Sequence, residues 1–111
     1  MRIAVASEGL DVAPQFAQCA NFNYFTTKSF EIVDSQNIPF RSCTIDDCVR
    51  LFKTIGTDAI ICDSISTVSQ RILTDQGFEV VQQAHGNALQ AAQRYIDARA
   101  RELDNEVYDR L

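Results

Sequence analysis

Short apolar stretches alternate with helical runs through the second half of the chain, and this alternation restricts the fold more than any other feature. Apolar residues recur at helical spacing over 44–55, 66–76 and 87–107, and apolar stretches at 58–62 and 78–81 separate these runs. Strands joined through helices are parallel, because each crossover returns the chain to the same end of the sheet. The pattern predicts an α/β protein whose sheet contains parallel strands.

The first half of the chain has the pattern of a strand, a loop and a hairpin. An apolar strand at 2–7 is followed by a loop, and two further strands at 22–27 and 30–35 are joined by a tight turn at 28–29. A hairpin reverses the chain direction, whereas the later crossovers restore it. We therefore expect a five-stranded mixed sheet with one antiparallel strand, in the element order β-β-β-α-β-α-β-α.

Four loops are expected at the edge where the parallel strands end. They span 8–20, 36–43, 63–66 and 82–86. In or beside them lie three cysteines and the single histidine of the chain: Cys19, Cys43, Cys62 and His85. Thiolate and imidazole are ligands that iron, copper and iron-sulfur species prefer, and open α/β sheets bind ligands at this edge. These four residues are candidate metal ligands.

Each of these residues also has an interpretation without a ligand. Cys19 is either a ligand or a thiol packed in its loop, and Cys43 precedes a helix whose dipole favours a thiolate. Cys62 ends an apolar strand and is either buried or a secondary ligand. His85 is either a solvated loop residue or a ligand. Cys48 falls on the apolar stripe of the first helix, so we interpret it as a core residue.

Composition and charge exclude several classes of protein. With 111 residues and 46% hydrophobic content, the chain suits a single domain. Its net charge of -5 comes from interspersed acidic and basic residues, so a nucleic-acid partner is not expected. No apolar run approaches the roughly 20 residues of a membrane helix, and no signal peptide is evident, so no membrane contact and a cytoplasmic location with reduced cysteines are expected.

The opening of the chain carries a family resemblance. The residues that carry it are Ser7, Glu8, Gly9, Val12, Phe16, Cys19 and Phe22. Their order resembles the dinitrogenase iron-molybdenum cofactor biosynthesis family, with its NifX/NafY-like and stand-alone small-domain members. The resemblance covers roughly 1–98 and implies a ribonuclease-H-like three-layer fold for that domain. The remaining residues, 99–111, are expected to form a C-terminal helical extension.

The same resemblance implies a set of cofactor-binding residues. The turn at 63–66 corresponds to a glycine-rich G-G-I-G turn of the family, and 84–87 matches its A-x-G-[TN] turn. Gln15 stands where the family usually has histidine. The implied cofactor-binding residues are Cys19, Gln15, Ser64, Ser66, His85 and Gly86. The replaced histidine and glycines distinguish this chain from the family pattern.

The expected function is that of a non-enzymatic binding or carrier protein. Its ligand would be an iron-sulfur or iron-molybdenum cluster, or a small anionic species, and the sequence leaves the identity of the cluster open. Its protein partners would be cluster-assembly proteins. A homodimer is left open. The alternative is a protein-interaction or regulatory module whose pocket has decayed and which acts through its C-terminal helix. An enzyme is not expected, because the first strand has no metal-binding carboxylate and no Ser-His-Asp, Cys-His or phosphate-loop pattern occurs.

Overall fold

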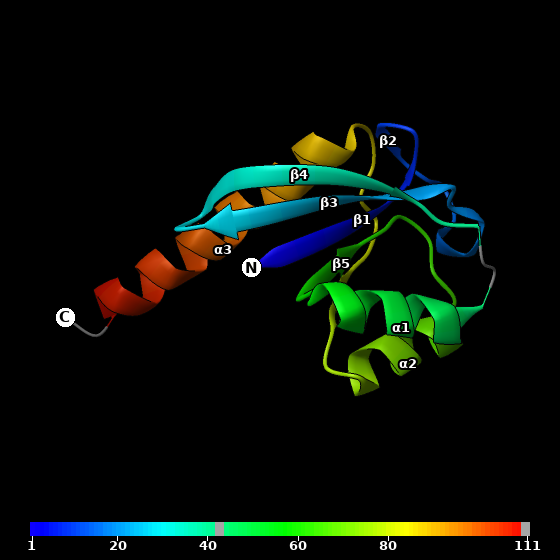
Figure 1. Cartoon of the computed structure of the whole chain (residues 1–111). Helices are drawn as coiled ribbons and strands as arrows, with labels where there is room; N and C mark the ends of the chain where they lie inside the picture. Colours follow the sequence, from blue (N-terminus) through cyan, green and yellow to red (C-terminus); the bar gives the residue numbers. More distant parts are fainter. Residues whose placement is uncertain (42–43, 110–111) are drawn as a thin grey trace.

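The computed structural model describes residues 1–41 and 44–109, with side chains described as far as Asp104. Figure 1 shows a sheet between two helices on one side and one long helix on the other. The elements in chain order are β1 (Arg2–Glu8), β2 (Asp11–Val12), the 3₁₀ helix η1 (Phe16–Gln18), β3 (Asn21–Lys28), β4 (Glu31–Pro39), α1 (Ile45–Ile55), β5 (Ala59–Ile61), α2 (Thr67–Asp75), β6 (Glu79–Val81) and α3 (Ala88–Asp109). None of the described helices has the length and apolar character required to cross a bilayer.

The sheet is mixed, as the sequence predicts. Its strand order is β4-β3-β1-β5-β6, where β1, β5 and β6 are parallel and β3 is antiparallel to both of its neighbours. The expected strand count is wrong, because the two-residue strand β2 also pairs with the end of β1 and makes the sheet six-stranded. Gly9, at φ 65°, allows the sharp reversal between them. The ribonuclease-H-like assignment stays a prediction.

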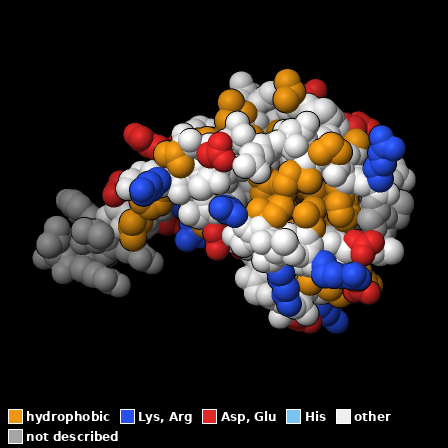
Figure 2. All heavy atoms as spheres, viewed as in Figure 1, with side chains coloured by type: hydrophobic (Ala, Val, Ile, Leu, Met, Phe, Trp, Pro, Cys, Tyr) orange, Lys and Arg blue, Asp and Glu red, His pale blue; other side chains and the backbone are white. Residues whose placement is uncertain are grey.

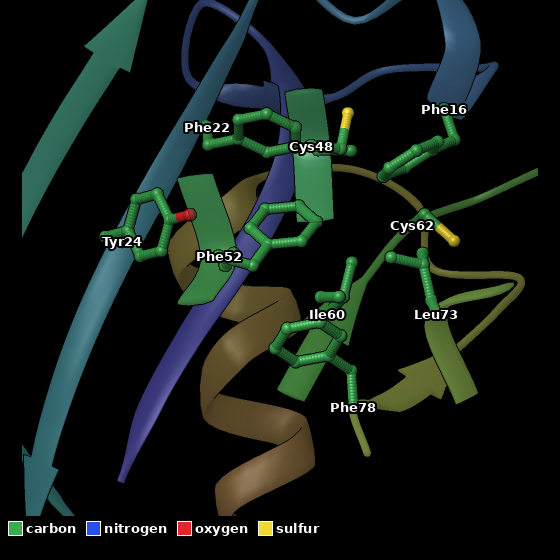
Figure 3. Packing of buried hydrophobic residues seen from close by; sticks show 11 residues of the cluster. Phe16, Phe22, Tyr24, Cys48, Phe52, Ile60, Cys62, Leu73 and Phe78 are labelled. Atoms are coloured by element: carbon green, nitrogen blue, oxygen red, sulfur yellow. The ribbon is translucent and has the colours of Figure 1, made fainter. Parts of the chain in front are cut away.

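The two faces of the sheet build two separate cores. Along β1, Ala4 and Ala6 face the cluster under α1 and α2, whereas Ile3 and Val5 face the cluster under α3. This alternation is the two-residue period of a strand buried on both sides. Figure 3 shows the first cluster, whose centre is the completely buried Phe52.

Local capping explains where α1 and α2 begin and end. The Thr44 hydroxyl accepts a hydrogen bond from the backbone N–H of Asp47 at 3.2 Å, and Ser66 does the same for Ser69 at 3.1 Å. Such caps satisfy N–H groups that have no partner within the helix. Gly56 ends α1 in the left-handed conformation, at φ 76°. The predicted ends of α1 are confirmed.

The hairpin differs in detail from its prediction. The turn lies at Ser29 and Phe30, both at positive φ, one residue later than expected. Strand β4 continues to Pro39, beyond the predicted end at 35. The added residues are Gln36, Asn37, Ile38 and Pro39. Because β4 is an edge strand with little buried surface, no apolar alternation marks this stretch.

Candidate functional site

The predicted gathering of loops at one edge of the sheet is confirmed by hydrogen bonds. The backbone N–H of Phe16 donates to the carbonyl of Ser64 at 2.8 Å, and the N–H of Val12 donates to the carbonyl of Gly86, also at 2.8 Å. The N–H of Phe40 donates to the carbonyl of Ala20 at 3.1 Å. The loop that follows β1 is thus held by the loops that follow β4, β5 and β6.

Two thiols line one small pocket at this edge. Cys19 of the first loop and Cys48 of α1 both face a cavity of about 30 Å³. The other residues around the cavity are Phe16, Ala17, Phe40, Thr44, Ile45 and Ser69. Cys19 is half-buried, and Cys48 is 5% exposed. The interpretation of Cys48 as buried is correct, but its place at the pocket is not evident from its helical stripe.

Cys62 lies in the same hydrophobic cluster as Cys48 but is fully buried. Figure 3 shows it between Phe16 and Leu73. It contributes to the core directly beneath the edge. The remaining candidate, Cys43, falls outside the described residues, so its predicted role as a ligand stays a prediction.

Burial keeps all three described thiols protonated at neutral pH. It raises the pKa of Cys19 to about 11 and the pKa of Cys48 and Cys62 to about 12. The charge of a Cys19 thiolate adds to the rise at both Cys48 and Cys62, so ionisation of one thiol opposes ionisation of the others. Such thiols are weak nucleophiles without an activating partner.

His85 lies at the same edge but lines a different pocket. Its Nδ1 atom is 3.2 Å from Oδ2 of Asp63, and its carbonyl accepts a hydrogen bond from Arg94 at 2.9 Å. The His85 pocket, of about 460 Å³, also borders Ile61 and several α3 residues on the face of the sheet that α3 covers. The Cys19 pocket belongs to the other face. Cys19 and His85 therefore share an edge without sharing a pocket.

The other predicted binding residues hold the loops together. Gln15 is exposed and its backbone bridges to Ser64. The Ser66 hydroxyl caps α2, so one of the helix N–H groups that an anion could use is already paired. Gly86 has φ 81°, which a residue with a side chain rarely adopts, and its carbonyl is bonded to the loop after β1.

The described residues contain no group of three or more His, Cys, Asp or Glu side chains close enough together to hold a metal ion. Within that part of the chain, the thiols of Cys19 and Cys48 are the two soft donors that line a common cavity. Two thiols can bind a soft ion of low coordination number. They can also form one side of a larger metal site that a further donor completes.

Solved structures with the same fold come from several proteins. The crystal structure of PH0822 superposes with a TM-score of 0.80 at 16% identity, covering 88% of this chain and 92% of that one. A candidate dinitrogenase from Methanocaldococcus jannaschii gives 0.73 at 15% identity, covering 88% of this chain and 89% of that one. The apo form of the orange protein from Desulfovibrio gigas gives 0.72 at 20% identity, with coverages of 87% and 88%.

These similarities establish the fold, because their sequence identities are low. No curated protein matches the chain in sequence. The profile of one family, described as dinitrogenase iron-molybdenum cofactor, matches residues 1–98. That range includes the whole sheet, the loops at its edge and every described cysteine. The chain belongs to the dinitrogenase iron-molybdenum cofactor family.

Proposed function

We propose that this protein is a non-enzymatic carrier that binds a soft metal ion or a metal-sulfur cluster at the Cys19 pocket. The observation that carries the proposal is that Cys19 and Cys48 line one cavity inside the domain matched by the family profile. An iron-sulfur or iron-molybdenum cluster is the cargo that fits the family context. A small anionic species is the other ligand class.

The size of the pocket restricts how cargo is held. A cavity of about 30 Å³ is close to the volume of one water molecule, so it accepts a single ion. A cluster of several metals is larger and would contact the thiols from the open side of the pocket. The chemistry of the two thiols suits iron in a sulfur environment or Cu(I). Cys43, which precedes α1 in sequence, is the proposed third donor.

Binding at these thiols is coupled to proton release. Metals bind the thiolate form, whereas burial keeps Cys19 and Cys48 protonated near neutral pH. Each thiol that binds must lose a proton to solvent. The affinity for metal should therefore increase with pH.

A hydrophobic surface next to the pocket suits the docking of a partner protein. Figure 2 shows hydrophobic side chains gathered between β4 and α1. Partly buried Ile38, Phe40, Ile45 and Val49 pack at this side of the core, and two of them also line the Cys19 pocket. We infer that a cluster-assembly protein would dock here. The proposed location is the cytoplasm, where thiols are kept reduced.

The remaining candidate residues have supporting roles in this proposal. Gln15, Ser64, Ser66 and Gly86 lie in the loops at the edge and would contact the outer part of a cluster. Cys62 supports the pocket from the core, and His85 would contact only cargo that extends to the α3 side of the edge. These assignments extend the predicted cofactor-binding and metal-binding sets.

The test is metal and sulfide analysis of protein purified without oxygen, before and after reconstitution with iron and sulfide or with Cu(I). We expect binding that is lost in Cys19→Ser and strongly reduced in Cys48→Ser. Ser69→Ala, at the same pocket but without a thiol, is the matched control and should bind normally. Wild-type protein that takes up no iron, molybdenum or copper after reconstitution would contradict the proposal.

A further inference from the structure

A pocket on the α3 side of the sheet lies between the start of α3 and the strands β3 and β4. Its volume is about 410 Å³, which is typical of sites for small molecules. It shares no lining residue with the Cys19 pocket or the His85 pocket. Figure 1 shows the first turns of α3 beside β2. We call this the asparagine pocket and define it by Leu10, Asn23, Phe25, Asn37, Asn87 and Leu89.

The walls of the asparagine pocket are mostly apolar. Phe25 belongs to the core under α3 and is 5% exposed, whereas Leu10 and Leu89 are 71% and 50% exposed. Such exposed leucines can cover the apolar faces of a ligand. None of the described residues that line the pocket is charged, so a charged ligand would lose hydration there without gaining a partner. The pocket therefore favours an uncharged ligand.

The polar side chains of the pocket belong to a hydrogen-bond network around Gly9. The N–H of Gly9 donates to Oδ1 of Asn21 at 2.8 Å, and its carbonyl accepts from Nδ2 of both Asn21 and Asn23 at 2.9 Å. Nδ2 of Asn23 also donates to Oγ of Ser7 at 2.9 Å. Nδ2 of Asn21 also donates to Oδ1 of Asn37 at 2.8 Å. These bonds fix which end of each side-chain amide is the oxygen.

The network leaves one acceptor and one donor without a partner in the described chain. Both hydrogens of the Asn23 amide are used, and no described residue donates to its Oδ1, although Asn23 is only 6% exposed. Likewise, no described residue accepts from Nδ2 of Asn37. A buried side-chain oxygen without a donor is rare. The Asn23 oxygen therefore points to a donor supplied from within the pocket.

These two groups lie side by side. Asn23 and Asn37 are directly opposite each other in the pairing of β3 with β4. Opposite residues of antiparallel strands have their side chains on the same face, with Cβ atoms about 4.5–5.5 Å apart. Phe25, two residues after Asn23, belongs to the core under α3, so the shared face is the α3 side. The pocket thus presents a hydrogen-bond acceptor next to a donor.

The first turn of α3 adds a second donor. The N–H groups of a first turn have no acceptor within the helix. The N–H of Ala88 donates to the carbonyl of Leu10 at 2.8 Å, and the N–H of Gln90 donates to Oδ1 of its cap at 3.1 Å. No described residue accepts from the N–H of Leu89, which lines the pocket.

We propose that the asparagine pocket binds an uncharged, planar heterocycle of the nucleobase type, with an N–H donor beside an acceptor on one edge. The ligand N–H donates to Oδ1 of Asn23, and the neighbouring ligand acceptor accepts from Nδ2 of Asn37. The faces of the ring pack against Phe25 and Leu89, where a flat ring gains more contact than a chain. This binding does not require metal at the Cys19 pocket, because the two pockets lie on opposite sides of the sheet.

The test is a titration of isotope-labelled protein with uracil and with adenine, followed by amide chemical shifts in two-dimensional NMR. With each probe up to about 5 mM, dissociation constants near about 1 mM are measurable. We expect saturable shifts of the side-chain amides of Asn23 and Asn37 and of the backbone amide of Leu89. Uracil methylated on both ring nitrogens has no N–H donor, and benzoate is charged, so both should bind at least about tenfold more weakly.

Leu89→Asp separates binding from folding. Aspartate in the first turn of a helix interacts favourably with the helix dipole, so this variant should unfold at the same or a higher urea concentration than wild type. It should bind uracil at least about tenfold more weakly, because it places a charge in an uncharged pocket. Val68→Asp is the matched control, since Val68 has the same second position in α2, is 70% exposed and does not line the pocket. It should leave binding unchanged.

Asn37→Ala removes the donor beside Asn23 and should weaken uracil binding about two- to tenfold, the effect of one hydrogen bond. Asp34→Ala, exposed on the same strand but away from the pocket, should have no effect. Wild-type protein without saturable shifts in either titration would overturn the proposal. Binding that Leu89→Asp and Asn37→Ala leave unchanged, or methylated uracil that binds as well as uracil, would overturn it too.

Discussion

Cys19 and His85 lie at the same edge of the sheet but line pockets on opposite sides of it. The Cys19 pocket belongs to the side covered by α1 and α2, and the His85 pocket to the side covered by α3. Among the described residues, the other soft donor that lines the Cys19 pocket is Cys48. This separation decides which variants should affect metal binding.

His85→Ala should leave Cu(I) binding unchanged, whereas Cys48→Ser should remove it or lower its affinity by at least about tenfold, the effect of losing about 1.4 kcal/mol. His85 is highly exposed and borders a pocket without a thiol. Competition with a chromophoric Cu(I) chelator under anaerobic conditions measures both effects. Equal losses in the two variants would show that imidazole and thiol act at one site.

The thiol of Cys19 should react slowly in the native protein. Its pKa of about 11, compared with 9.0 for an ordinary thiol, reduces the thiolate at neutral pH by about 100-fold, since each pKa unit is tenfold. Iodoacetamide labelling followed by peptide mass spectrometry measures the rate at each cysteine, with protein in urea as the reference. We expect Cys48 and Cys62 to react more slowly still, because both are buried. Native Cys19 reacting as fast as in urea would contradict its burial.

Alkaline pH should destabilise the fold. Below about pH 9 the native and unfolded states both hold the thiol protons, so the free energy of unfolding does not depend on them. Above that pH the unfolded chain loses the protons of Cys48 and Cys62, whereas the native state keeps them until the pKa of about 12. The free energy of unfolding should fall by about 1 kcal/mol per buried thiol on reaching pH 10.

Urea unfolding between pH 7 and pH 10 measures this decrease. Cys62→Ala removes one of the two buried thiols, so its free energy of unfolding should fall less steeply over the alkaline range, whatever its value at neutral pH. Identical slopes for the variant and the wild type would exclude Cys62 as a source of the pH dependence.

Phe52→Ala should be the most damaging single truncation in the core under α1 and α2. The Phe52 ring is fully buried and packs edge-to-face on Phe22 and Phe78, with ring centres 5.1 and 5.7 Å away. Truncation of a buried phenylalanine costs about 3–5 kcal/mol, a large part of the stability of a small domain. Urea unfolding by circular dichroism measures the loss, and exposed Val68→Ala should cost less than about 0.5 kcal/mol.

Much of the fold could be predicted from the sequence, because its signals are local. The pairing of Thr44 with Asp47 and the left-handed Gly56 depend on neighbouring residues, and both are visible in the sequence. The order of the main strands and helices follows from periodicity in the same way. Strand β2 could not be predicted, because a two-residue strand has no periodicity and exists only through its pairing with β1.

The candidate site could be predicted from the sequence only in part. The sequence by itself determined that the loops carrying Cys19 and His85 meet at one edge, since crossover topology dictates where parallel strands end. Only the tertiary structure decided which side of the sheet each side chain occupies and that Cys48, a buried helix residue, shares the Cys19 pocket. The physical reason is that strand order is a property of chain connectivity, whereas the sharing of one pocket by two thiols depends on the packing of α1 against a distant loop.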